Sequence, residues 1–261
     1  MKANTIIRRF GRFAACVAML AAAACTGNFE DYNTKPFRPS DDDLNGDNVG
    51  VGILFPAMME FVTHFQVNAS QMHDVLVADE LGGYTSAVKS YQGQNIATYN
   101  PSDKFNDYIF EQTFANFYGN YFKVETQTGG EGPVYQLARI LRVAAMLRVT
   151  DAYGPIPYSK LESNESVYVE YDSQEAVYTK MFEELDEAIE ILGRNTTLPA
   201  EAWSRYDGVY YGNIAQWLKY ANSLKLRMAM RLSYVKSDVA RAKAAAAIAG
   251  GVIEANADNA A

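Results

Sequence analysis

The sequence predicts an all-α fold of antiparallel helix pairs, joined by long loops and with little or no strand. Three features of the chain support this class. From residue 51 onward, apolar side chains recur every three or four residues, which places them along one face of a helix. Glycine pairs and Gly-Pro steps follow several of these stretches, as they do where helices end. Alternation of apolar and polar residues, which marks a half-buried strand, is limited to a brief signal at 168–171.

Three helices are predicted first, over 52–65, 72–81 and 105–125. The first two carry apolar residues at helical spacing, and Gly82-Gly83 ends the second. The third is rich in aromatic and apolar residues three and four positions apart, namely Phe105, Tyr108, Ile109, Phe114, Phe117, Tyr118 and Tyr121. This spacing aligns them on one side of the helix.

The next helix is predicted over 133–152. Pro133 opens it, since proline fits the first turn, where a backbone N–H is not needed. Gly154 suits the left-handed end of the helix, and two prolines stiffen the extended segment that follows. We therefore expect the Tyr158 ring to be held in a fixed direction. A long loop separates this helix from the next.

The helix predicted over 172–193 has the clearest amphipathic pattern. Asp172 and Glu175 resemble a capping box with aspartate as the cap, and Gly193 ends the helix. One stripe is apolar and consists of Tyr178, Met181, Phe182, Leu185, Ile189 and Leu192. The acidic residues are expected mostly on the other faces, and they are Glu183, Glu184, Asp186, Glu187 and Glu190.

Two more helices complete the predicted fold, one beginning at Ile214 after a cap at Asn213, and an alanine-rich one over 238–249. Three basic residues interrupt the apolar pattern of the first, namely Lys225, Arg227 and Arg231. We expect them to extend to solvent or to pair with the acidic helix before them. Some helix pairs have the size of tetratricopeptide units, although the full consensus of that repeat is absent.

The beginning of the chain has the pattern of a secretory signal over residues 1–24. Four basic residues precede an apolar stretch at 13–24, which is shorter than the roughly 20 residues that span a bilayer. The stretch ends in LAAAAC, which resembles a bacterial lipobox with Cys25 as the lipidated residue, although its alanine at position 22 replaces the usual leucine. The alternative is ordinary signal cleavage nearby, with Cys25 incidental.

Residues 25–50 are polar, rich in Asp, Asn, Gly and Pro, and lack a hydrophobic period, which predicts a tether for a folded domain over 51–261. The formal net charge of the chain is −8, and loss of the basic signal makes the mature protein more acidic. Such a chain is poorly suited to bind nucleic acid or an anionic lipid surface. We expect it to contact the membrane only through its lipid anchor.

The sequence carries little sign of catalysis. It has two histidines, His64 and His73, on different predicted helices, and it lacks a His pair at metal spacing, a phosphate loop and a nucleophile elbow. Asp79 and Glu80, at a helix end, are the best candidates for an acidic pair, but a role in structure or hydrogen bonding is favoured for both. We expect no enzymatic activity, no metal and no cofactor.

A tyrosine-rich loop over 82–104 is the candidate binding site. Tyr84, Tyr91 and Tyr99 lie there among amide side chains, including that of Asn95. A sugar ring can stack its C–H face on an aromatic ring while amides bond its hydroxyls, and the same groups also suit a peptide. The alternative is that these tyrosines pack on the adjacent helices.

Three stretches resemble the SusD/RagB family of outer-membrane nutrient-binding lipoproteins. They are CTGNFEDYNTKP at 25–36, RVTDAYGPIPYSKL at 148–161 with the helix that follows it, and YYGNIAQWLKYANSLKLRMAMRLS at 210–233 with GGVIEANADNA at 250–260. Their order and spacing match the family, and the resemblance covers essentially the whole chain.

The resemblance implies a mostly α scaffold of tetratricopeptide-like helix pairs, anchored by lipid in the outer membrane and facing the cell exterior. It implies a SusC-like TonB-dependent transporter as partner and an oligosaccharide, or less often a peptide, as ligand. A lipid-anchored interaction scaffold without a small ligand is the alternative function. Family members are usually longer, so we expect a domain truncated at its C-terminal end and an exposed apolar face near 214–249.

Overall fold

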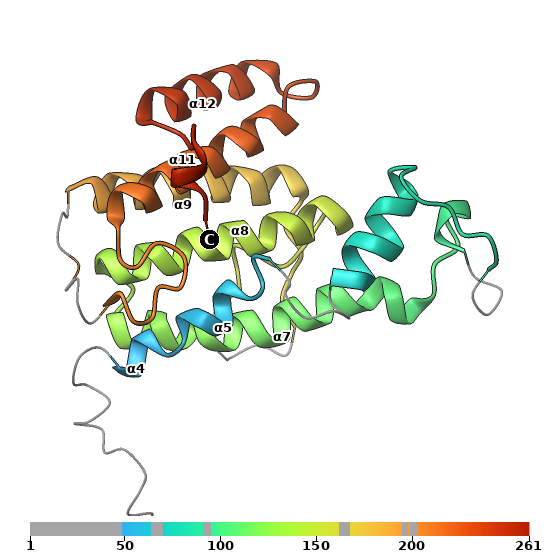
Figure 1. The fold of residues 1–261 in the computed structure, drawn as a ribbon, viewed down its shortest axis with the longest axis horizontal. Helices are drawn as coiled ribbons and strands as arrows, with labels where there is room; N and C mark the ends of the chain where they lie inside the picture. Colours follow the sequence, from blue (N-terminus) through green and yellow to red (C-terminus); the bar gives the residue numbers. More distant parts are fainter. Residues whose placement is uncertain are drawn as a thin grey trace, which may run out of the picture. The chain divides into compact units, whose positions relative to one another are not determined.

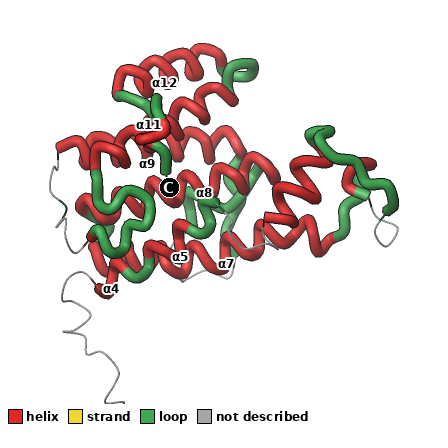
Figure 2. The backbone as a smooth tube through the Cα atoms, in the orientation of Figure 1, coloured by secondary structure: helices red, strands yellow, loops and turns green. Residues whose placement is uncertain are grey.

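The computed structural model describes residues 49–63, 70–90, 95–161, 168–194, 198 and 203–260. Within these ranges the chain forms helices and loops, with two isolated β-bridges and no β-strand (Figure 2). The all-α prediction is confirmed. The predicted signal peptide and Cys25 lie outside the described residues, as does nearly all of the tether.

Five long helices form the body of the structure, each packed on the next along the chain (Figure 1). They are α7 (Asp103–Thr128), α8 (Gly132–Tyr153), α9 (Gln174–Arg194), α11 (Ile214–Arg231) and α12 (Ser237–Gly250). Helix α8 is buried along most of its length, which explains why its sequence is apolar on nearly all faces. Neighbouring helices cover it on both sides.

Shorter elements surround this body: α4 (Val49–Gly52), α5 (Phe55–Met59), the π-helix η2 (Gln71–Asp79), and the 3₁₀ turns η3 (Ile96–Thr98) and η4 (Asn256–Asp258). The single helix predicted over 52–65 is therefore wrong. Pro56 lies in the first turn of α5, and its missing N–H cannot continue the hydrogen bonds of a preceding turn. The helix predicted over 72–81 exists but is wound mainly as a π-helix.

The N-terminal cap predicted for α11 is present in the structure, whereas the one predicted for α9 is not. Asn213 caps α11 as predicted, through its side-chain oxygen. The cap predicted at Asp172 is wrong, because the Ser173 hydroxyl oxygen accepts the backbone N–H of Ala176, 3.3 Å away. Asp172 instead accepts the backbone N–H of Ser159 at 2.6 Å and its hydroxyl at 2.9 Å. The carboxylate thus fastens the loop before α9 rather than the helix itself.

A buried ionic network joins α7, α8 and α9 at the centre of the protein. Arg142 donates to the Glu184 carboxylate at 3.0 Å, to the Tyr158 carbonyl at 2.6 Å and to the Tyr118 hydroxyl at 3.3 Å. The Tyr158 hydroxyl donates to the other oxygen of Glu184 at 2.5 Å. The ring of Tyr158 is fully buried, so the expectation of a fixed direction is confirmed.

Ion pairs also tie the last helices to the body. Asp186 on α9 binds both Lys225 on α11 and Lys243 on α12. Burial acts to raise the pKa of Asp186, but the hydrogen bonds from the two lysines outweigh it and lower that pKa. Arg231 pairs with Asp151 of α8 at 2.6 Å. The predicted pairing with the acidic helix is confirmed for Lys225, whereas Arg231 pairs with another helix.

An exposed apolar face near 214–249 was predicted, and it is present. Large apolar side chains of α11, α12 and their connection are exposed, namely Met230, Tyr234, Val235, Val239 and Ile248. Helix α12 packs on α11, while its other side remains open within the described residues.

The buried tyrosines predict that the folded state loses stability in alkali. Burial raises the pKa of Tyr118 to about 12, although Arg142 acts to lower it. A tyrosine in an unfolded chain has a pKa of about 10, so between about pH 10 and 12 the unfolded state releases the proton first. We therefore expect the free energy of unfolding to fall by about 2–3 kcal/mol from this residue as the pH rises through that range.

Denaturant unfolding followed by circular dichroism at pH 8 and at several values between 10 and 12 checks this result. Tyr118→Phe removes the ionisable hydroxyl and should reduce the loss of stability above pH 10. Tyr234→Phe, at a fully exposed ring, is the matched control and should leave the pH profile unchanged. Identical profiles for the wild type and Tyr118→Phe would contradict the assignment.

Candidate functional site

The loop that follows η2 begins with a tight backbone turn. The carbonyl oxygen of Asp79 accepts the backbone N–H groups of Tyr84 at 2.8 Å and Thr85 at 3.2 Å. Gly83 lies between them with φ +74°, a left-handed conformation that glycine adopts without steric cost. The turn therefore directs the loop away from η2 and projects Tyr84 outward.

A second turn fixes the other end of this loop. Asn95 pairs with Asn100 through two backbone hydrogen bonds of 2.8 and 3.0 Å. The Asn95 side-chain oxygen accepts the backbone N–H of Ala97 at 2.9 Å, and a Glu80 carboxylate oxygen accepts the same N–H at 3.2 Å. Glu80 thereby links η2 to this turn. Tyr99 adopts φ +56°, a conformation that tyrosine seldom takes.

Both described tyrosines of the loop point into solvent. The exposed fraction is 87% for Tyr84 and 84% for Tyr99. The alternative that they pack on the adjacent helices is therefore wrong for these two residues. Tyr91, the third predicted contact, lies outside the described residues.

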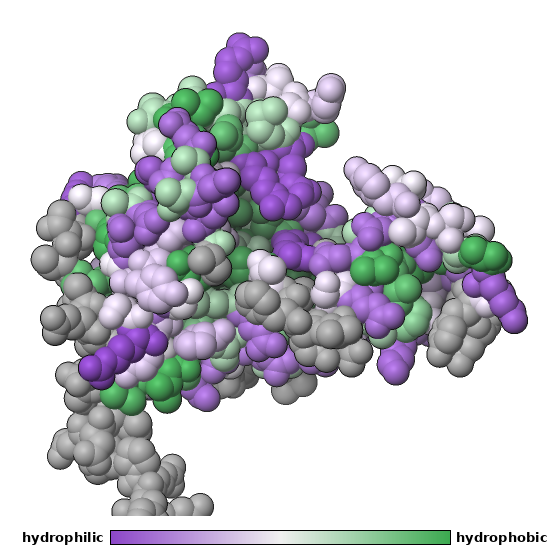
Figure 3. All heavy atoms as spheres, in the orientation of Figure 1, coloured by the Kyte–Doolittle hydropathy of each residue, from purple (hydrophilic) through white to green (hydrophobic). Residues whose placement is uncertain are grey.

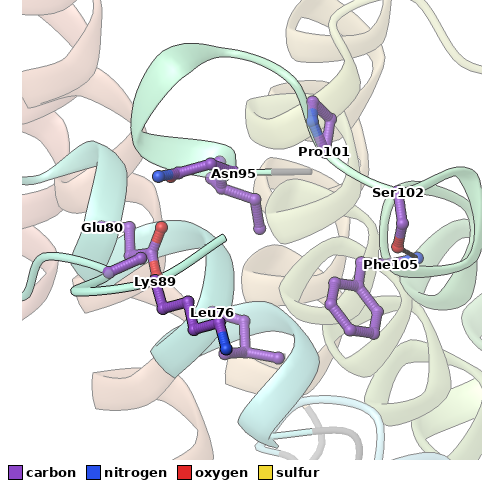
Figure 4. A pocket seen from close by; sticks show the side chains of 9 residues that line it. Leu76, Glu80, Lys89, Asn95, Pro101, Ser102 and Phe105 are labelled. Carbon is purple, nitrogen blue, oxygen red and sulfur yellow. Dashed lines mark hydrogen bonds between the residues drawn. The ribbon is translucent and has the colours of Figure 1, made fainter. Parts of the chain in front are cut away.

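A small pocket of about 240 Å³ lies between η2 and the turn at Asn95 (Figure 4). Its lining combines apolar and polar side chains, namely Leu76, Glu80, Ala87, Lys89, Asn95, Ile96, Pro101, Ser102 and Phe105. The Asn95 oxygen is engaged, while its side-chain nitrogen has no hydrogen-bond partner among the described residues and can donate to a ligand. The pocket supplies a donor and an ammonium group beside apolar walls.

The pocket lining includes one of the predicted site residues and several residues that were not predicted. Asn95 lines the pocket, whereas Tyr84 and Tyr99 lie outside its lining, on the same loop. Lys89 and Phe105 were not predicted as site residues. Each approaches the pocket because η2 folds back on the start of α7, an arrangement for which the sequence has no local signal.

No catalytic or metal-binding constellation is present in the described ranges. No group of three or more His, Cys, Asp or Glu there is arranged to hold a metal ion. The Glu80 carboxylate serves the loop as a hydrogen-bond acceptor, in line with the structural role that was favoured for it. His64 lies outside the described residues.

None of the described helices combines the length and apolar composition needed to cross a bilayer.

The described residues form a scaffold of packed helices that presents exposed tyrosines on one loop beside a small pocket. The family model described as Susd and RagB outer membrane lipoprotein matches residues 31–261. The chain therefore belongs to the SusD/RagB family. A search of curated proteins gave no match.

Solved structures of the family superpose on this chain. A SusD-like protein from Bacteroides thetaiotaomicron is 32% identical with a TM-score of 0.72, and a homologue from Bacteroides ovatus is 39% identical with a TM-score of 0.71. A chitin-binding SusD homologue from Flavobacterium johnsoniae is 32% identical with a TM-score of 0.71. Each match covers 80% of this chain, which spans 43% of both Bacteroides proteins and 45% of the Flavobacterium protein.

Proposed function

We propose that this protein is a cell-surface lipoprotein that captures an oligosaccharide and delivers it to a SusC-like TonB-dependent transporter of the outer membrane. It acts by binding and not as an enzyme. Membership of a family of outer membrane lipoproteins supports the location. In this proposal residues 1–24 are the signal peptide, Cys25 carries the lipid, and residues 25–50 tether the helical domain, which continues to 261.

The observation that carries the proposal is the exposure of Tyr84 and Tyr99 on one loop with Asn95. Exposed aromatic rings are costly in water, and a sugar ring recovers that cost by stacking its C–H face on them. The side-chain nitrogen of Asn95 and the ammonium of Lys89 are donors for sugar hydroxyls. The relative described as chitin-binding supports a glycan over a peptide.

The experiment is a calorimetric titration of the full chain with a panel of oligosaccharides, including chitin oligosaccharides, and of peptides. The double variant Tyr84→Ala/Tyr99→Ala should bind the preferred glycan about tenfold or more weakly, because each stacked ring contributes about 0.5–1.5 kcal/mol. Tyr234→Ala is the matched control, since Tyr234 is equally exposed but lies between α11 and α12.

The outcomes separate the proposal from its alternatives. Binding of peptides alone would exclude the glycan. If no small ligand binds but the protein still binds the transporter, the lipid-anchored interaction scaffold would be favoured. Glycan binding that survives the double variant would place the site away from this loop.

A further inference from the structure

A second and larger pocket, of about 570 Å³, lies on a neighbouring face of η2. It is open to solvent and is lined by η2, the first turns of α7, the end of α8 and the end of α11. Figure 3 shows hydrophilic side chains bordering the hollow between the α11 and η2 parts of the surface. Three arginines line this pocket, namely Arg148, Arg227 and Arg231, an unusual concentration in a chain of net charge −8.

Two of the three arginines are already neutralised. Arg148 donates to an Asp74 oxygen at 2.8 Å and to the carbonyl of Val62 at 3.3 Å. Arg231 binds an oxygen of Asp151 at 2.6 Å. Each aspartate thus offsets one arginine, and the pocket keeps the charge of the third.

Arg227 is that third arginine, and its guanidinium has no hydrogen bond or ion pair with any residue in the described part of the chain. Asp151, which also lines the pocket, accepts from the Tyr178 hydroxyl at 2.6 Å and pairs with Arg231, whereas Arg227 acts on it through its charge without a hydrogen bond. Arg227 and Arg231 are four residues apart on α11, so their side chains lie on one face, a turn apart. Their free N–H groups can converge on one small anion.

The geometry points to a carboxylate as that anion. A guanidinium presents two parallel N–H donors that match the two oxygens of a carboxylate. A single excess positive charge suits a monoanion, whereas a polyanion would meet the carboxylates of Asp74 and Asp151. Val77, Ala78 and Ile109 give the pocket apolar walls for the body of the ligand.

We propose that this pocket binds the carboxylate of an acidic sugar, a uronic acid, with Arg227 as its principal ligand. The inference rests on the proposed glycan capture and names the class of glycan. Phe105 lines both this pocket and the smaller one beside Asn95, so one oligosaccharide can reach from the tyrosine loop to Arg227. The loop then holds neutral sugars, and Arg227 selects the acidic one.

The test compares an oligosaccharide that carries a uronic acid with its carboxyl-reduced counterpart, titrated calorimetrically into the full chain. Wild type should bind the acidic form about tenfold more tightly, as expected for one charge-assisted bidentate contact. Arg227→Gln should abolish this preference and leave the affinity for the reduced form unchanged. Arg227→Lys keeps the charge but loses the paired donors, and should retain only part of the preference.

Arg241→Gln, at an exposed arginine of α12 outside the pocket, is the matched control and should behave as wild type. Equal melting temperatures would show that Arg227→Gln is folded. Equal affinity of wild type for both sugars, or a preference that survives Arg227→Gln, would overturn the inference while leaving glycan capture intact. Competition by peptide C-termini but not by uronates would also overturn it, whereas failure of every glycan to bind would overturn the proposed function itself.

Discussion

Replacing Glu184 by alanine is expected to lower the free energy of unfolding by about 3–5 kcal/mol. The carboxylate is 2% exposed and accepts from both Arg142 and the Tyr158 hydroxyl. Its removal leaves the Arg142 guanidinium buried against three tyrosine rings, with the centre of the nearest ring 4.2 Å away, and without a counter-charge. An unpaired charge at this depth costs far more than the loss of a surface ion pair.

Denaturant unfolding at neutral pH measures the effect. Glu183→Ala is the control, because Glu183 is the adjacent residue on α9 but is exposed, and among the described residues it pairs only with Lys180, at 3.3 Å. That change should stay within about 0.5 kcal/mol. Combining Glu184→Leu with Arg142→Met should recover much of the loss, since both charges of this buried pair are then removed. Similar effects of the Glu183 and Glu184 substitutions would contradict the role assigned to the network.

The burial of Glu184 shows where sequence reasoning about this fold reached its limit. The apolar stripe of α9 was predicted correctly, because the 3.6-residue period is a local property. Glu184 was assigned to the acidic, mostly exposed faces for the same reason. Its partner Arg142 is 42 residues away on a helix with little amphipathic contrast, so no local pattern pairs the two. Long-range polar networks of this kind emerge only when the helices pack.

In the candidate site, too, some features follow from the local sequence and others depend on the packing of the helices. The tyrosines and amides of the loop predicted a ligand-binding site, and this stays a prediction. The exposure of Tyr84 and Tyr99 excludes only the alternative that these two rings pack on the adjacent helices. The π-helical winding of η2 and the pocket beneath Asn95 could not be predicted, because both depend on the contact of η2 with α7. In the sequence Arg227 was only one of three basic residues on a predicted helix. That it makes no hydrogen bond or ion pair with the other described residues became apparent only from the packing of α11 against α8.

Asp207→Ala is expected to lower the free energy of unfolding by about 3 kcal/mol or more. The Asp207 carboxylate is fully buried and accepts four N–H groups. These come from the backbone of Val209, Tyr210 and Gly212, at 3.0, 3.0 and 2.8 Å, and from the Trp217 indole at 2.7 Å. Removal of the acceptor leaves these donors unsatisfied in the interior, and each costs about 1–3 kcal/mol if water cannot reach it.

The backbone adds to this cost. The turn contains two consecutive left-handed residues, Tyr211 with φ +53° and Gly212 with φ +81°, and tyrosine adopts this conformation only when its surroundings enforce it.

Asp207→Asn retains one acceptor oxygen but turns an amide toward other donors, so it should lose about half as much stability as Asp207→Ala. Asp107→Ala, at an exposed aspartate of α7, should change the stability by no more than about 0.5 kcal/mol. Unfolding followed by far-ultraviolet circular dichroism avoids the signal of Trp217 itself. A variant as stable as the Asp107 control would show that water satisfies these donors and that the carboxylate does not organise the turn.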